Sequence, residues 1–147
     1  MDLFEPHIWI ANRSDFNQRV GYFYDQFETR SMENLVKNGE RVYRENEAHW
    51  LAVLDEGIDA CAAWSAASGK RLVTTEAWGV VDYKDWPLLS WDWVKEPCAH
   101  GARRAVATGR WAAICTSNFC GPQFLGMWRD LEWHRTLTKV IRASRIV

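Results

Sequence analysis

Glu76 is the side chain whose type and position point most clearly to chemistry. It ends a short apolar, β-branched run in the segment RLVTTEAWG, residues 71–79, and an aromatic residue and a glycine follow it closely. A carboxylate held at the end of a buried strand is suited to nucleophilic or acid–base work. The alternative is a strand whose terminal glutamate simply meets solvent, and the rest of the sequence must decide between the two.

The tryptophan content gives a second indication of function. The chain holds ten tryptophans among 147 residues, and tryptophan is enriched where flat ligands or protein partners bind. Sugar rings and protein surfaces are therefore both candidate partners.

The four cysteines, Cys61, Cys98, Cys115 and Cys120, show no C-x-x-C spacing. This favours reduced thiols over a metal site, and we expect neither a metal nor a cofactor.

Three apolar segments are predicted to form the strands that position these residues. The first covers residues 3–11, LFEPHIWIA, with Pro6 near an end or an irregularity because proline cannot donate to a ladder. The second covers residues 72–75 and delivers Glu76. The third covers residues 111–116, WAAICT, and a loop at 117–124 follows it.

Helical periodicity fills the intervals between the strands. Ser14 is a suitable N-cap for a helix reaching Phe27, and a second helical stretch runs over residues 35–43 with Gly39 as a break or bend. A long helix is predicted from about residue 46 to a left-handed cap at Gly69. A further helix covers residues 88–108, and an interior proline there costs roughly 3 kcal/mol. We therefore expect a kink or break just before Pro97.

One more helix is predicted after the third strand, over residues 127–141. Strands that alternate with helices indicate right-handed βαβ crossovers and a parallel sheet, with functional loops at the carboxyl ends of the strands. The fold class is therefore α/β. Three such strands with helices on one side would leave a sheet face and both edges uncovered.

Composition excludes several classes of protein. A formal net charge of −1 gives no electrostatic footprint for nucleic acid. The sequence has no signal-peptide pattern and no apolar stretch near the roughly 20 residues that span a bilayer. We expect a cytoplasmic protein with neither nucleic-acid nor membrane partners. Its length fits one domain over residues 1–147.

Three segments carry a resemblance to a known family. EPHIW, VTTEAWGVVDYKDWP and TSNFCGPQFLGMWRD resemble the sugar-binding cellulase-like glycoside hydrolases, which are built on the (β/α)8 barrel. The resemblance covers nearly the whole chain and implies a partial TIM barrel of about three βα units, corresponding to the sixth, seventh and eighth strands. It implies a C-terminal portion of such a barrel, without the fourth strand that carries the acid/base carboxyl.

The same resemblance suggests roles for individual residues. It places the nucleophile of a retaining glycosidase at Glu76, and it makes His7 and Trp9, in a His-x-aromatic pattern, candidates for substrate binding. Trp78, Asn118 and Gln123 are further candidates for sugar contact, the first by stacking and the other two through amide groups. The alternatives are a structural histidine, core tryptophans and ordinary turn residues. Glu5 is the nearest available substitute for the missing acid/base.

Three functional hypotheses remain open. The first is a truncated glycoside hydrolase that carries the nucleophile and is inactive alone. The second is a non-catalytic module that binds oligosaccharides or self-associates through its exposed strand edges into a homo-oligomer. The third is that Met1 is an internal methionine of a longer reading frame and that the product has no independent role.

Overall fold

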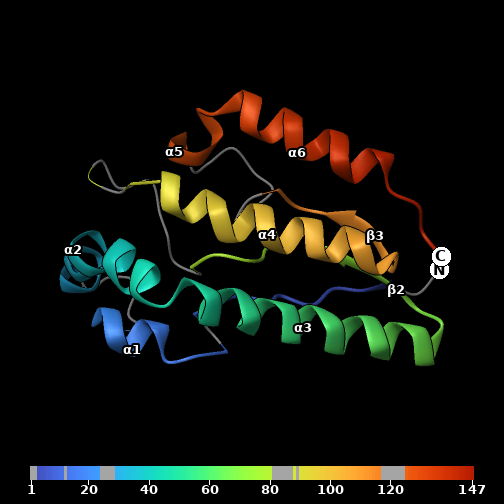
Figure 1. Cartoon of the computed structure of the whole chain (residues 1–147), viewed down its shortest axis with the longest axis horizontal. Coiled ribbons are helices and arrows are strands. Elements are labelled where there is room, and N and C mark those ends of the chain that lie inside the picture. The colour runs from blue at the N-terminus through green and yellow to red at the C-terminus, as the bar shows by residue number, and fades with distance from the viewer. Residues whose placement is uncertain (1–2, 12, 24–28, 81–87, 89, 117–124) are drawn as a thin grey trace.

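The structure is a computed structural model that describes residues 3–11, 13–23, 29–80, 88, 90–116 and 125–147. Its elements alternate between strands and helices in the order that the sequence predicts (Figure 1). They are β1 (Leu3–Phe4), α1 (Phe16–Val20), α2 (Thr29–Glu45), α3 (Glu47–Ser68), β2 (Arg71–Thr74), α4 (Asp92–Thr108), β3 (Trp111–Ile114), α5 (Leu125–Trp128) and α6 (Leu131–Ala143).

The three strands form one parallel sheet in the order β1-β2-β3. Leu72, at the centre, pairs with Phe4 on one side and with Trp111 on the other, and a register shift follows it. The predicted parallel α/β fold, with about three βα units, is therefore confirmed. The predicted first strand is shorter than expected, because the ladder stops before Pro6 and resumes only as a single bridge between Trp9 and Trp78.

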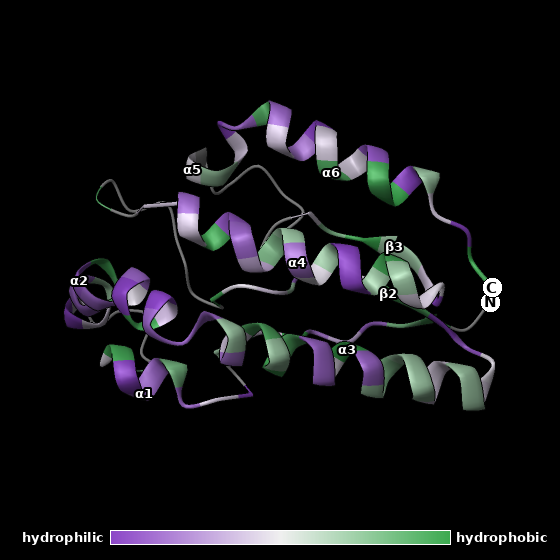
Figure 2. Ribbon diagram, viewed as in Figure 1, coloured by the Kyte–Doolittle hydropathy of each residue, from purple (hydrophilic) through white to green (hydrophobic). Residues whose placement is uncertain are grey.

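Three long helices, α3, α4 and α6, lie side by side along one side of the sheet (Figure 1). Leu72 and Thr74 are buried on the strand that these helices cover. Figure 2 shows hydrophilic residues recurring on the outward sides of the helices and a largely apolar β3 behind them. Among the described residues no helix is both long and apolar enough to cross a membrane.

The other face and the edges of the sheet are uncovered by the described part of the chain, as the sequence predicts. Leu3 and Phe4 of β1 are 48% and 43% exposed, and Ala112 and Ala113 of β3 are also exposed. Exposed apolar strand residues are costly in water.

Aromatic side chains dominate the core. Trp50, Trp78, Trp93, Tyr43 and Phe16 are the largest fully buried side chains. The indole N–H of Trp50 donates to the carbonyl oxygen of Val42 at 3.0 Å, which removes the cost of burying an unpaired donor. Trp50 and Trp93 therefore stabilise the packing of the helices against one another, through ring contacts with Phe16.

Helix α4 runs without a break through Pro97, so of the kink or break predicted before this residue the break is wrong. Pro97 is itself buried, and α4 packs between α3 and α6. On its flanks Lys95 pairs with Asp130 at 2.7 Å and Glu96 pairs with Arg44 at 2.5 Å. Packing on both sides outweighs the roughly 3 kcal/mol that an interior proline costs.

Three other helix predictions also need correction. Helix α1 ends at Val20, because Gly21 takes φ 79° there, and does not reach the predicted Phe27, which lies outside the described residues. Helix α2 runs through Gly39 without ending. A Cβ at this position would lie 3.1 Å from the ring of Trp93, so close packing explains this glycine.

The last predicted helix is two helices, α5 and α6, because Asp130 caps α6 by accepting from the Trp133 N–H. The cap at Gly69, by contrast, is confirmed, with φ 70° at the end of α3.

Candidate functional site

The candidate site lies at the carboxyl edge of the sheet, just beyond β1 and β2. Because the strands are parallel, the residues that follow each one arrive at the same edge. Glu5 and His7 follow β1, and Thr75 and Glu76 follow β2. The structure therefore brings together the acid and the histidine that the sequence singled out.

His7 lies between two carboxylates. Its Nε2 is 3.6 Å from Glu5 Oε1, and its Nδ1 is 3.9 Å from Glu76 Oε2. The three side chains are between 41% and 44% exposed. These separations exceed direct hydrogen-bond length but suit electrostatic attraction or a bridging water. An exposed carboxylate beside a histidine is thus open to a ligand from the solvent side.

Glu5 is held by the strand end next to Glu76. Its carboxylate accepts a hydrogen bond from the Thr75 N–H at 3.2 Å and another from the Thr75 hydroxyl. The Thr75 hydroxyl is the main cause that lowers the pKa of Glu5 below its ordinary value. Because a general acid needs a raised pKa, this environment opposes Glu5 as the acid/base substitute considered from the sequence.

The backbone turns sharply after Glu76. The Thr74 hydroxyl donates to the carbonyl oxygen of Glu76 at 3.0 Å, and Trp78 takes φ 84°, a left-handed value that is unfavourable for a bulky residue. The Trp78 N–H donates to Ile8 O at 2.6 Å, and the Ile10 N–H donates to Trp78 O at 3.3 Å. These bonds fasten the turn that carries Glu76 to the segment that carries His7.

The indole of Trp78 holds this turn against the end of β3 and against α4. It is 0% exposed, and its N–H donates to the carbonyl oxygen of Cys115, just after β3, at 3.0 Å. The ring lies against Gly101 of α4, where a Cβ would come within 2.4 Å of Trp78 Cε3. Trp78 therefore joins the ends of all three strands through its backbone and its side chain.

The structure separates the predicted substrate-binding residues into three groups. His7 is exposed at the site. Trp9 and Trp78 are 2% and 0% exposed, so this chain covers both rings. Asn118 and Gln123 lie outside the described residues. Sequence reasoning missed the Glu5–Thr75 contact and the packing of the Trp78 ring against Gly101. The signal for the first was an acidic residue two positions before His7. The signal for the second was a glycine within a helical pattern.

The described residues contain no group of three or more His, Cys, Asp or Glu side chains placed to hold a metal ion. Cys61, Cys98 and Cys115 are not joined in disulfides, and burial raises the pKa of Cys61. The ionisable side chains that the structure brings together at the site are two carboxylates, Glu5 and Glu76, and the imidazole of His7.

Comparisons with known proteins agree with this arrangement. A family model described as sugar-binding cellulase-like matches residues 1–142. A solved structure described as a putative glycoside hydrolase from Parabacteroides distasonis ATCC 8503 is 51% identical in sequence and superposes with a TM-score of 0.94. The match covers 100% of this chain and 39% of that protein, so this chain spans about two fifths of its length. No protein with a curated description matches the chain.

Proposed function

The chain belongs to the sugar-binding cellulase-like family, and from that premise we propose that it carries the nucleophile side of a retaining glycoside hydrolase site, with Glu76 as the nucleophile. The observation that carries this proposal is the exposed Glu76 carboxylate at the carboxyl edge of a parallel sheet, with His7 3.9 Å away. A glycoside or oligosaccharide is the proposed ligand.

The proposed reaction follows from the geometry of a carboxylate at a strand end. A Glu76 oxygen attacks the anomeric carbon, the bond from that carbon to the leaving oxygen breaks, and a second carboxyl group protonates the leaving oxygen. Water then attacks the same carbon, gives its proton to the second carboxylate and releases Glu76. The Trp78 turn supports this role because it holds Glu76 in one place.

The second carboxyl group must come from elsewhere in the proposed site. Glu5 is bound to Thr75 and its pKa is lowered, so it is poorly suited to donate a proton. The match covers only 39% of the solved relative. We infer that the acid/base belongs to polypeptide that corresponds to the remainder of that relative, and that this chain alone hydrolyses no glycoside.

A 2-deoxy-2-fluoroglycoside with a dinitrophenolate leaving group tests the nucleophile directly. Such a leaving group departs without protonation, so labelling does not depend on the acid/base. We would incubate a panel of these glycosides with the chain, alone and co-expressed with the part of the Parabacteroides protein that it does not match. Mass spectrometry should find one fluoroglycosyl group on the peptide that contains Glu76.

Two variants serve as controls for this labelling. Glu76→Gln should take up no label, whereas Glu33→Gln, at an exposed position of α2, should be labelled like the unaltered chain. Label of equal extent on Glu76→Gln, or on a different carboxylate, would rule out Glu76 as the nucleophile.

A non-catalytic sugar-binding or self-associating module is the second candidate. It is favoured by the lowered pKa of Glu5, which leaves Glu76 without an acid partner among the described residues. Calorimetric titration with cello-oligosaccharides separates the two candidates. Saturable binding that Glu76→Gln leaves unchanged, without any labelling, would support the module. Labelling that depends on Glu76 would support the hydrolase.

A further inference from the structure

Glu5 is the carboxylate of the candidate site that the proposed reaction leaves unused. It directly follows β1, and its side chain is 41% exposed. Among the described residues its polar partners are Thr75 and His7. Thr75 precedes Glu76 in the chain, and the Nδ1 of His7 lies 3.9 Å from Glu76 Oε2. Glu5 therefore contacts both neighbours of the proposed nucleophile.

The first contact of Glu5 lies in a gap of the parallel ladder between β1 and β2. Backbone pairing of these strands ends with β1 and resumes only at the bridge between Trp9 and Trp78. Within the gap the Thr75 N–H and the Thr75 hydroxyl both donate to Glu5 Oε1. The carboxylate thus takes the place of a main-chain acceptor. It fixes the end of β2 to β1 one residue before Glu76.

The second contact of Glu5 gives the His7 ring a direction. Nε2 lies 3.6 Å from Glu5 Oε1, while Nδ1 is turned to Glu76. The described residues offer His7 no other hydrogen-bond or ion-pair partner. The Thr75 hydroxyl lowers the pKa of Glu5, so this carboxylate is negative at neutral pH and attracts an N–H at Nε2. Rotation of the ring would lose this attraction, and Nδ1 therefore stays directed toward Glu76.

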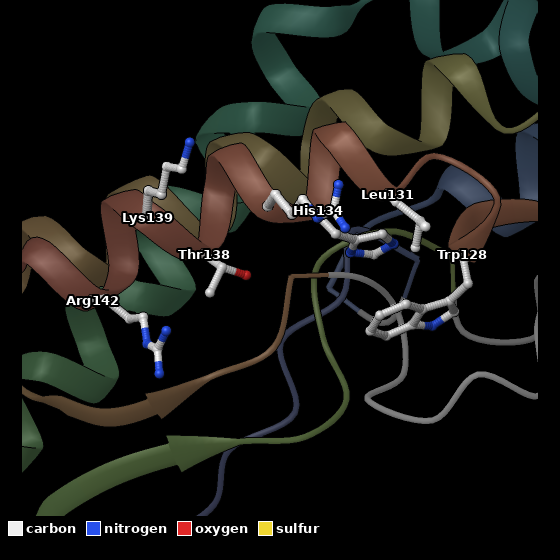
Figure 3. Close-up of a pocket in the computed structure, with 7 residues that line it drawn as sticks. Trp128, Leu131, His134, Thr138, Lys139 and Arg142 are labelled. Carbon is white, nitrogen blue, oxygen red and sulfur yellow. The ribbon is translucent and has the colours of Figure 1, made fainter.

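A second histidine, His134, shows how a firmly held ring is bound in this chain. It lines a groove of about 390 Å³ along α5 and α6, the α6 groove, which includes no residue of the candidate site. Figure 3 shows Trp128, His134, Thr138 and Arg142 directed to the same side of the helix. The rings of Trp128 and His134 are stacked, with centroids 4.0 Å apart and planes at 12°. This stacking fixes the plane of the imidazole.

Hydrogen bonds fix the direction of the His134 ring as well. Its Nε2 donates to Met127 O at 3.2 Å, and its Nδ1 accepts from the Thr116 hydroxyl at 2.7 Å. Burial lowers the pKa of His134, which agrees with a neutral ring. Among the described residues His7 has no polar contact as short as these. The direction of its ring therefore depends on the charge of Glu5.

We propose that Glu5 is a positioning residue for Glu76. It fixes the strand end at Thr75, and it turns the His7 ring so that Nδ1 faces the Glu76 carboxylate. Glu5 acts through these two neighbours and transfers no proton itself. The proposal rests on the proposed function, since it gives Glu5 a part in the reaction of Glu76 with a glycoside.

Nitrogen-15 spectra of the histidine rings at neutral pH test the orientation of His7 without a sugar. The chain has four histidines, and His7→Gln identifies the signals of His7. In Glu5→Gln the amide can still accept from Thr75 but no longer attracts Nε2–H by charge. We expect the shifts of the two His7 nitrogens, which report where the ring protons lie, to move toward those of free histidine. The His134 shifts should stay the same. His7 shifts that are equal in the two proteins would overturn the proposal.

Labelling kinetics test the effect on Glu76, with the fluoroglycoside and the protein preparations described for the proposed function. Glu5→Gln and Thr75→Val should each lower the labelling rate at saturating glycoside by about tenfold, because a misplaced nucleophile reacts more slowly. The glycoside concentration that gives half the maximal rate should hardly change, since the proposal gives neither residue a contact with the sugar. Thr75→Ser keeps the hydroxyl and should recover most of the rate that is lost in Thr75→Val.

Glu33→Gln, at an exposed position of α2, is the matched control and should give the spectra and the labelling rate of the unaltered chain. Circular dichroism checks that every variant folds. A Glu5→Gln protein that labels as fast as the unaltered chain, or that only binds the glycoside more weakly, would overturn the proposal. Equal loss of rate in Thr75→Ser and Thr75→Val would do the same.

The two measurements separate failure of this proposal from failure of the proposed function. Absence of label in the unaltered chain would reject the proposed function, and with it the role of Glu5 in that reaction. Label on Glu76 together with His7 spectra that do not depend on Glu5 would keep the nucleophile and reject Glu5 as its positioning residue.

Discussion

Trp78 shows how one residue sets the position of the candidate nucleophile. Its left-handed backbone, its bonds to Ile8 and Ile10 and its indole bond to Cys115 together define the path of the chain after Glu76. The strain of the positive φ is offset by full burial of the ring. The space for that ring exists because residue 101, on α4, has no side chain.

Gly101→Ala should therefore destabilise the protein. The added Cβ would lie 2.4 Å from Trp78 Cε3 and 2.7 Å from Cδ2. Overpacking of this kind costs about 1–3 kcal/mol, more than the ~1 kcal/mol gained in helix propensity. Urea unfolding measures the difference.

Gly39→Ala is the comparison, because its Cβ would meet its nearest neighbour only at 3.0 Å. A smaller loss is expected there. A Gly101→Ala protein as stable as the unaltered chain would show that Trp78 moves freely.

Glu5 should contribute stability that depends on pH. Its pKa is below the ordinary 4.5 in the folded state, chiefly because of the Thr75 hydrogen bond. Its stabilising effect is therefore present above the unfolded pKa and is lost as the pH falls through the folded value. Glu5→Gln should be less stable than the unaltered chain at pH 6–7, and the two should converge on acidification below pH 4.5.

Unfolding in urea at a series of pH values checks this, with Glu33→Gln, at an exposed position of α2, as the control substitution. A constant gap between Glu5→Gln and the unaltered chain at every pH would contradict the assignment.

For single residues, the sequence predicted that Glu76 and His7 lie beyond strand ends, because an apolar run shows where a strand ends. It did not predict that Trp78 is buried. That depends on Gly101, more than twenty residues further along the chain, and nothing local to Trp78 records it.

Among the elements, α4 most clearly shows the limit of local rules. Pro97 by itself predicts a break, and the break does not occur, because the helix is packed on both sides and Pro97 is buried with it. Long helices such as α3 were predictable, since both their periodicity and their glycine cap are local. The division between α5 and α6 was not recognised, although Asp130 followed by an apolar residue is an N-cap signal.

Asp130 should stabilise α6 in two separable ways, as its N-cap and through an ion pair to α4. It accepts from the Trp133 N–H as the N-cap of α6 and pairs with Lys95 of α4, which is the main cause that lowers the pKa of Asp130. Asp130→Asn keeps a cap but loses the ion pair, whereas Asp130→Ala loses both. The melting temperature should fall in the order Asp, Asn, Ala.

Thermal melts followed by circular dichroism measure this order. High salt should narrow the gap in melting temperature between Asp and Asn but not the gap between Asn and Ala, because it screens the ion pair and leaves the cap in place. Equal melting temperatures for Asn and Ala would exclude a capping contribution.

At the scale of the whole molecule, the described residues form a sheet that they cover on one side. The alternation of strands and helices predicted this architecture and the uncovered strand edges, because both follow from the number of elements. It did not predict the α6 groove. That groove depends on the contact of Thr116 with His134, which exists only once β3 and α6 are placed together.

Hydrogen exchange should reflect this one-sided architecture. β2 is paired on both sides and Leu72 is fully buried, whereas β1 has two exposed residues at an edge. Amides of Arg71–Thr74 should therefore exchange more slowly than those of Leu3–Phe4. Mass spectrometry of the unbound chain measures both segments. Faster exchange in β2 than in β1 would contradict the observed strand order.

The stack of Trp128 on His134 gives the groove an optical signal of its own. An indole parallel to an imidazole 4.0 Å away has an emission sensitive both to protonation of that ring and to displacement of water from its open face. A polypeptide that covers this stack would displace water from Trp128, while Trp50, Trp78 and Trp93 stay enclosed. The difference in emission between the unaltered chain and Trp128→Phe would then report occupancy of the groove without an attached dye.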